Sequence, residues 1–77
     1  MVYVYVIRSQ TRNYNYVGIS SELEVRVERH NKGQNKTTKS YTPFDLIYTK
    51  AFPNHADARV HEKFLKSGKG RAFIKTL

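Results

Sequence analysis

Five side chains of this 77-residue sequence are of types that could do chemistry. Tyr5 and Tyr16 lie eleven residues apart, so a turn between them would bring both hydroxyls to one side of a hairpin. Arg26 and His30 are four residues apart and would be neighbours on a helix. Both could donate hydrogen bonds to phosphate oxygens, although the same spacing fits a solvated helix face. The fifth is Glu62, the one acid in the basic last quarter of the chain.

Glu62 shares a helical face with the apolar side chains of Ala58 and Leu65, at i, i+4 and i+7. A carboxylate on an apolar face is costly to bury unless it is paired or bound to a metal. Two alternatives are therefore open, an ion pair with a nearby Lys or Arg and a metal site. A single Glu can hold Mg²⁺ beside a substrate phosphate, because Mg²⁺ keeps several of its waters.

Other catalytic and cofactor motifs are absent from the sequence. The three histidines show neither HxxxH nor HExxH spacing, and no cysteine is available, so a zinc site is not expected. The chain has no Walker A loop, no GxGxxG fingerprint and no GxSxG nucleophile motif. These absences remove the commonest nucleotide-cofactor and serine-hydrolase classes.

Three runs of β-branched and aromatic residues predict the strands that would carry the tyrosines. Residues 2–7 are apolar throughout, which indicates a strand buried on both faces, and residues 14–19 resume strand character after a polar turn. The two would form a hairpin. Residues 44–52 predict a third strand.

Helix signals occupy the segments between and after these strands. Ser21 and Glu24 have the spacing of a capping box, and the helix that follows should stop at Gly33. The polar stretch of residues 34–40 is predicted to be an exposed loop. Asn54 and Asp57 predict the start of a second helix, ending at residues 67–68, and residues 70–77 can form a third. The order ββαβα(α) predicts an α+β fold, a three-stranded antiparallel sheet flanked by helices.

Composition points to a polyanionic partner. Fourteen Lys and Arg against six Asp and Glu give a net charge of +8. The alternative is a solvated basic surface that keeps the protein soluble and binds no nucleic acid. The length allows one domain, over residues 1–77. The side chains expected to bind nucleic acid are Arg29, Lys32, Lys36, Lys39, Lys63, Lys66, Lys69 and Arg71. Residues 1–7 are too short for a membrane span, and the lack of cysteine suits the cytoplasm.

The sequence resembles the GIY-YIG nuclease superfamily. Tyr3-Val4-Tyr5 and Tyr16-Val17-Gly18 look like its paired signature, and Arg26, His30 and Glu62 fall where that family carries its helical Arg, its His and its metal-binding Glu. The resemblance covers residues 2–74 and is closest to the small stand-alone bacterial type, which is like the N-terminal domain of UvrC. The first triplet departs from the pattern, with Tyr3 for Gly and Val4 for Ile, and Val17 replaces Ile in the second. An Asn that many relatives carry in a C-terminal helix has no clear match.

The resemblance implies a metal-dependent endonuclease that hydrolyses phosphodiester bonds in DNA that is single-stranded, branched or nicked, with RNA as an alternative substrate. Tyr5 would be the general base or water orienter, assisted by Tyr16 and His30, with a pKa held down by Arg26 and the metal. Arg26 would clamp the phosphate. Glu62 would bind one Mg²⁺ or Mn²⁺, and Gly18 would allow close backbone approach.

Two other functions remain open at this point. One is a non-catalytic nucleic-acid-binding module that keeps the nuclease fold, and the other is a basic structural protein of a ribonucleoprotein. The resemblance implies no obligate protein partner and no membrane. A monomer or a weak homodimer is expected.

Overall fold

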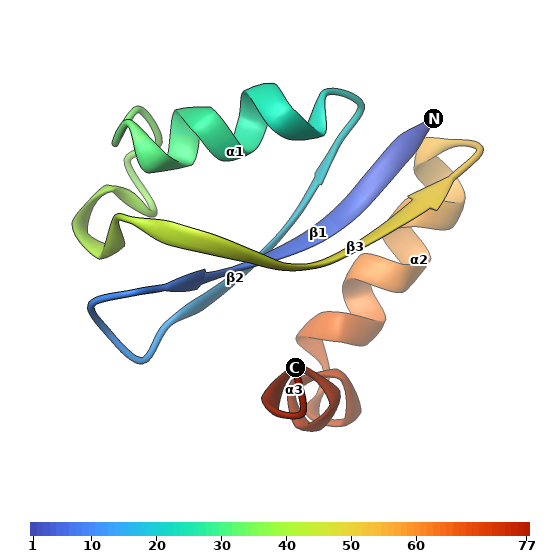
Figure 1. The fold of residues 1–77 in the computed structure, drawn as a ribbon. Helices are drawn as coiled ribbons and strands as arrows, with labels where there is room; N and C mark the ends of the chain where they lie inside the picture. Colours follow the sequence, from blue (N-terminus) through green and yellow to red (C-terminus); the bar gives the residue numbers. More distant parts are fainter.

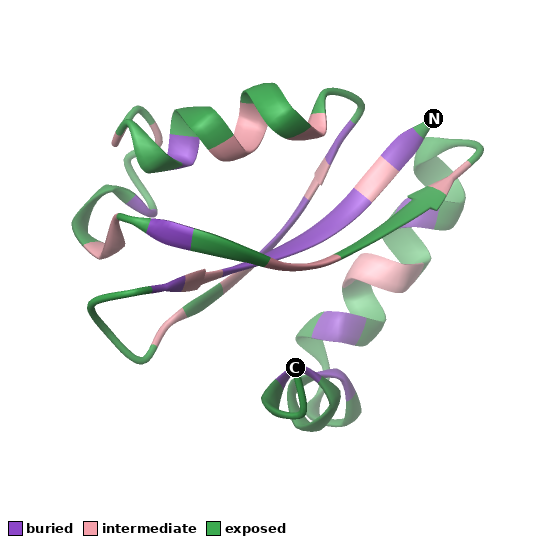
Figure 2. Ribbon diagram, viewed as in Figure 1, coloured by how far each residue is buried: buried purple, intermediate pink, exposed green.

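The strand β1 (Val2–Ser9) forms the centre of the sheet in the computed structural model, which describes residues 1–77. It pairs antiparallel with β2 (Asn15–Ser20) on one side and with β3 (Phe44–Phe52) on the other. The sheet order is therefore β2-β1-β3. Its central strand is the most continuously buried segment, as Figure 2 shows and as the unbroken apolar run predicts.

Alternation along β1 directs its side chains to two different cores. Val2, Val4 and Val6 face a cluster that includes Leu65 of α2 (His55–Lys66) and Ile74 of α3 (Gly68–Lys75). Tyr5 and Ile7 face the other way, where Leu23 and Val27 of α1 (Leu23–Asn31) pack. The helix α1 thus covers one face of the sheet, and α2 and α3 cover the other (Figure 1). The predicted α+β fold is confirmed.

The helix α1 ends as the sequence predicts but does not start that way. Gly33 has φ +73°, and the N–H groups of Gly33 and Gln34 donate to the carbonyls of His30 and Arg29, which is a Schellman motif. The predicted capping box is wrong. The N-cap is Glu22, without a side-chain cap, and the Glu22 N–H donates instead to the Ser20 hydroxyl. The end of β2 therefore organises the turn into α1.

The segment after α1 is more ordered than an exposed loop. It contains the 3₁₀ turn η1 (Lys39–Tyr41), and the side chain of Thr38 is fully buried beneath it. The prediction of an exposed loop over residues 34–40 is wrong at Thr38, because a buried side chain on α1 supplies a hydrogen-bond partner there.

The C-terminal half follows the local signals closely. The Asp57 N–H donates to the Asn54 side chain at 2.8 Å, as predicted for the α2 N-cap. The last helix starts at Gly68, two residues earlier than predicted, because the Ser67 hydroxyl accepts from the Gly70 N–H and caps it. None of the helices is both long and apolar enough to cross a membrane.

Candidate active site

His30 lies at the centre of the site, fully buried between α1 and the sheet. Its Nε2 is 3.0 Å from the Tyr5 hydroxyl oxygen, and its Nδ1 is 2.8 Å from the Thr38 hydroxyl oxygen. Burial lowers the pKa of His30, and the nearby Arg26 charge lowers it further. A neutral imidazole carries one donor and one acceptor nitrogen, so Tyr5 and Thr38 take opposite hydrogen-bonding roles around the ring.

The last turn of α1 directs His30 at the sheet because the following residue ties the helix to β3. The Phe44 N–H donates to Asn31 Oδ1 at 2.6 Å, and Asn31 Nδ2 donates to the Phe44 carbonyl at 3.4 Å. Together with the Schellman motif, these bonds hold the end of α1 over Tyr5. The sequence predicted His30 as a phosphate-seeking donor on a helix face, but the structure buries it and gives both its nitrogens partners inside the protein.

Tyr16 and Gly18 shape the other side of the Tyr5 ring. The Tyr16 ring centroid lies 4.9 Å from that of His30 and 6.4 Å from that of Tyr5. Gly18 pairs directly with Tyr5 across the hairpin. A Cβ at Gly18 would lie 2.5 Å from both Cζ and the hydroxyl oxygen of Tyr5. Glycine at this position is therefore what allows the Tyr5 ring to lie flat against β2.

Arg26 and Glu62 reach the same hydroxyl electrostatically. Burial is the largest cause of a raised pKa at Tyr5; Tyr16 and Glu62 raise it further, and Arg26 lowers it. His30 thus bonds to the Tyr5 hydroxyl, while Tyr16, Arg26 and Glu62 act on its pKa, and Glu62 does so from the other side of the sheet. The expectation that positive charge holds the Tyr5 pKa down is wrong for the protein by itself, because desolvation outweighs the Arg26 charge.

Glu62 is half-buried on α2 and forms an ion pair one turn along the helix. Lys66 Nζ lies 3.1 Å from Glu62 Oε2, and this bond engages only one of the two carboxylate oxygens. No group of three or more His, Cys, Asp or Glu side chains could enclose a metal. A single carboxylate with one free oxygen fits a hydrated Mg²⁺ or Mn²⁺ that completes its shell with water and phosphate oxygens, and it does not fit a structural zinc.

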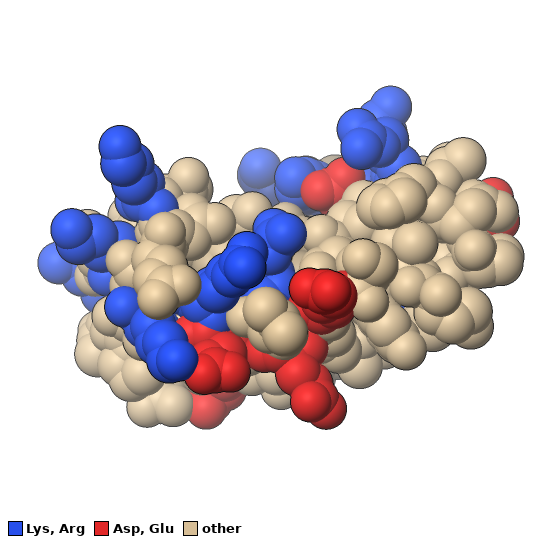
Figure 3. Space-filling view, turned by 90° about the horizontal axis from the view of Figure 1, so that it is seen from above, with Lys and Arg blue, Asp and Glu red and all other residues tan.

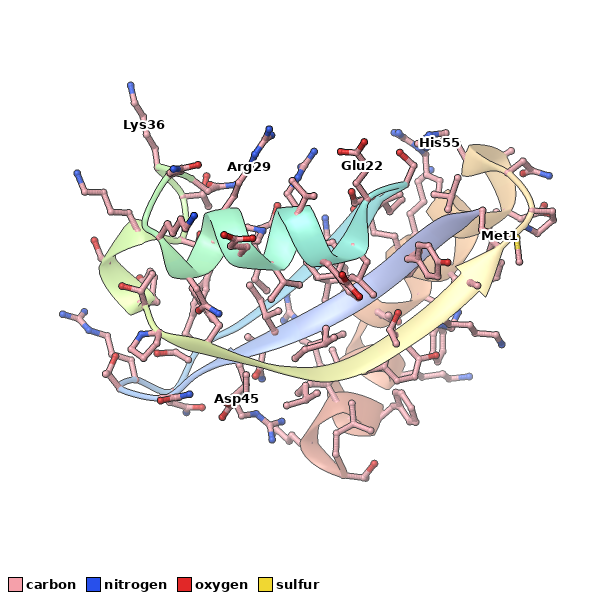
Figure 4. The ribbon with its side chains drawn as sticks, turned by 45° about the horizontal axis from the view of Figure 1, so that its top comes forward. Met1, Glu22, Arg29, Lys36, Asp45 and His55 are labelled. Carbon is pink, nitrogen blue, oxygen red and sulfur yellow. The ribbon has the colours of Figure 1, made fainter.

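The predicted nucleic-acid-binding residues form two groups on opposite faces of the sheet. Arg29 and Lys32 lie on α1, and Lys36 and Lys39 follow it; Lys63 and Lys66 lie on α2, and Lys69 and Arg71 on α3. Arg29 and Lys36 point away from the sheet (Figure 4). Lys32 pairs with Glu28 at 2.6 Å. Figure 3 shows acidic side chains beside basic ones over α1, so this face is not a continuous basic patch.

Thr38 is the one residue of the hydrogen-bonded centre that the sequence did not indicate. It lies in a polar stretch whose composition is typical of an exposed loop, and it reaches Nδ1 of His30 only because η1 folds back under α1. No spacing rule links the two residues, which are eight positions apart across a helix end.

Comparison with known proteins places this sequence in a family. The GIY-YIG catalytic domain matches residues 1–75 of the chain. The chain belongs to the GIY-YIG family. Among curated relatives, a UPF0213 protein of Pediococcus pentosaceus is 43% identical over 76 residues, which is 97% of this chain and 79% of that protein. UPF0213 proteins of Oceanobacillus iheyensis and Clostridium perfringens are 34% and 33% identical, over 83% and 86% of this chain and 74% and 71% of theirs. No solved structure matches significantly.

Membership in the GIY-YIG family confirms the resemblance and indicates a nuclease whose substrate is a nucleic acid. Nucleases of this family generally depend on a divalent metal. The GIY-YIG hairpin of this chain keeps Tyr5, Tyr16 and Gly18 in contact although Tyr3 replaces the first glycine of the signature. Tyr3 is half-buried on the same face of β1, two residues from Tyr5, and pairs with Ser20.

Proposed function

We propose that the chain is a metal-dependent endonuclease that hydrolyses phosphodiester bonds in DNA that is single-stranded, branched or nicked. The observation that carries this proposal is the buried hydrogen bond between Tyr5 and a neutral His30, within electrostatic reach of Arg26 and Glu62. Tyr5 and His30 are both buried, and burying polar groups costs free energy unless they are hydrogen-bonded, which is why this pair is the centre of the proposed site.

Tyr5 acts as the base through His30. Since burial raises the Tyr5 pKa, a standing phenolate is disfavoured, and the hydroxyl accepts a proton only as it gives up its own. The water proton moves to the Tyr5 oxygen while the Tyr5 proton moves to His30 Nε2. The water oxygen then bonds to phosphorus, and the bond to the leaving oxygen breaks. Nε2 can accept in the tautomer whose Nδ1–H donates to the Thr38 hydroxyl, 2.8 Å away, and the relay uses that tautomer.

Arg26 and Tyr16 contact the substrate phosphate and the attacking water. The Arg26 guanidinium, half-buried on α1, binds the non-bridging phosphate oxygens and stabilises the charge that grows on them. Tyr16 packs on His30 and presents its hydroxyl to the attacking water. Glu62 would hold the Mg²⁺ or Mn²⁺, which supplies charge neutralisation at the leaving oxygen when bound.

A cleavage assay tests this function directly. The purified wild type and Glu62→Gln are incubated with labelled single-stranded, duplex and branched DNA in Mg²⁺, Mn²⁺ or EDTA. We expect cleavage by the wild type in the metal lanes only, and none by Glu62→Gln. Glu28→Gln is the matched control, because it removes a carboxylate from the other i,i+4 Glu–Lys pair, on the opposite face. Binding without cleavage in every metal lane would instead support the non-catalytic binding module.

The cellular setting stays a prediction. Cytoplasmic location rests on the cysteine-free composition, and a role in DNA repair rests on the proposed chemistry. The assay above, run with RNA of the same sequence, separates the two nucleic acids as substrates.

A further inference from the structure

A pocket of about 380 Å³ lies beside the site, between the edge strand β2 and the helices α2 and α3. Its floor is apolar, and its rim carries three cations, Lys66, Arg71 and Lys75, with no acid among the lining residues. Asn15 and Tyr16 complete the wall on the β2 side. A concave site with three cations on its rim has the chemistry of a phosphate or phosphodiester subsite.

The walls of this pocket are held together by Arg8, which reaches across from β1. Arg8 Nε donates to Asn15 Oδ1 at 3.0 Å, while its Nη2 and Nη1 donate to the carbonyls of Ile74 and Leu77 at 3.0 and 2.9 Å. One guanidinium therefore fixes β2 to the C-terminal end of α3, where its charge also suits the helix dipole. The pocket is thus a built feature of the fold.

Two of the pocket residues also belong to the site. Tyr16 packs against His30, and Lys66 pairs with Glu62 at 3.1 Å. The Lys66 side chain is 55% exposed against 19% for Glu62, so the ammonium is the less confined partner of the pair. Lys66 can rotate toward the pocket that it already lines without disturbing buried structure.

We propose that this pocket holds the phosphodiester next to the scissile one, and that Lys66 serves it once a divalent cation has replaced the ammonium at Glu62. This inference rests on the proposed function, since it places the strand relative to Tyr16 and Glu62. A divalent cation at the carboxylate repels the ammonium a few ångströms away, and the neighbouring phosphate attracts it. Lys66 thus couples metal binding to strand binding, and the coupling is reciprocal.

The strand side of the proposal is tested by the salt dependence of binding. Binding of a labelled single-stranded oligonucleotide is measured at several salt concentrations, in Mn²⁺ or in EDTA, in a Tyr5→Phe background in which cleavage is slow compared with the measurement. We expect Lys66→Met to reduce the slope of log K against log salt by about 0.7 in Mn²⁺, the loss of one phosphate contact. In EDTA the slope should hardly change, because Lys66 is engaged with Glu62. Arg71→Met should reduce the slope in both conditions.

The metal side is tested without nucleic acid. Titration with Mn²⁺ should show about two- to fivefold tighter binding to Lys66→Met than to the parent, because a competing ammonium has been removed. Arg59→Met is the control for charge alone, since Arg59 is exposed on the same helix but lies outside the pocket and outside any ion pair. It should leave the salt slope unchanged and change the metal affinity less than Lys66→Met does, because it is not bonded to Glu62.

The outcomes separate the two proposals. An unchanged slope in both Lys66→Met and Arg71→Met overturns the pocket as a subsite, even if the wild type cleaves DNA. If Lys66→Met changes the salt slope equally in Mn²⁺ and in EDTA, or leaves the Mn²⁺ affinity unchanged, the coupling between metal binding and strand binding is overturned. If the variants show the expected salt slopes but the wild type cleaves no DNA, the pocket binds phosphodiesters and the proposed nuclease function is wrong.

Discussion

The hydroxyl of Tyr5 and Nε2 of His30 form a buried hydrogen bond of 3.0 Å between the central strand and α1. The opposite face of the molecule carries a similar pair, Tyr48 and His61, with 2.9 Å between hydroxyl oxygen and Nε2. The second pair is only partly buried and packs among the aromatic side chains of Phe52, Phe64 and Phe73. It provides an internal control for the first.

Removing the Tyr5 hydroxyl should slow catalysis strongly. We expect Tyr5→Phe to lower the cleavage rate by about 100-fold or more, because the proton relay to His30 loses its first member. Single-turnover cleavage measures this. Tyr48→Phe removes the equivalent hydroxyl from the other pair and should leave the rate unchanged. A Tyr5→Phe enzyme as fast as the Tyr48→Phe enzyme would rule out the relay.

A methyl group at Gly18 should displace the Tyr5 ring. The added Cβ would lie 2.5 Å from the Tyr5 ring carbon Cζ, so we expect Gly18→Ala to lower the free energy of unfolding by about 1–3 kcal/mol. Urea denaturation checks the change. Gly68→Ala is the matched control, since its Cβ would meet nothing within 4 Å, and in a helix it should stabilise slightly. Equal stabilities for the two variants would contradict the close packing of Tyr5 on β2.

The buried neutral His30 should make the fold sensitive to acid. Its pKa is lowered from 6.5 in the folded state, so as pH falls below about 6.5 the unfolded chain takes up a proton that the folded chain does not. Stability is complete above that pH and decreases below it. His61, whose pKa is also lowered, adds a second contribution.

Urea unfolding between pH 7 and pH 5 measures this dependence as a slope of stability against pH. His30→Gln should flatten the slope, whatever its effect on stability at pH 7. His55→Gln, at an exposed position at the start of α2, should leave the slope as in the wild type. If His30→Gln keeps the wild-type slope, His30 does not remain neutral in the fold.

Arg26 should be needed as a guanidinium and not merely as a charge. We expect Arg26→Ala to reduce the cleavage rate by at least about 100-fold, and Arg26→Lys to recover only part of it, because an ammonium cannot bind two phosphate oxygens side by side. Cleavage rates at saturating metal test this. Arg59→Ala should behave as wild type. Full recovery in Arg26→Lys would reduce Arg26 to a general electrostatic role.

The sequence by itself determined most of the elements and predicted the residues of the candidate site. An unbroken β-branched and aromatic run predicted β1, Asn54 predicted the start of α2, and Gly33 predicted the end of α1, because each signal acts over a few residues of backbone. The register of the tyrosine hairpin with Arg26, His30 and Glu62 identified the family, which the match over residues 1–75 confirms.

Only the tertiary structure decided how these residues behave. The burial of His30, its contact with Thr38 and the raised pKa of Tyr5 arise from packing α1 on the sheet, which no spacing rule contains. The choice of Lys66 as the partner of Glu62 was one of several that the sequence allowed. Arg8 ties the walls of the pocket together by bonding to Asn15 of β2 and, 66 positions along the chain, to the Ile74 carbonyl of α3, and contacts of that range depend on the whole fold.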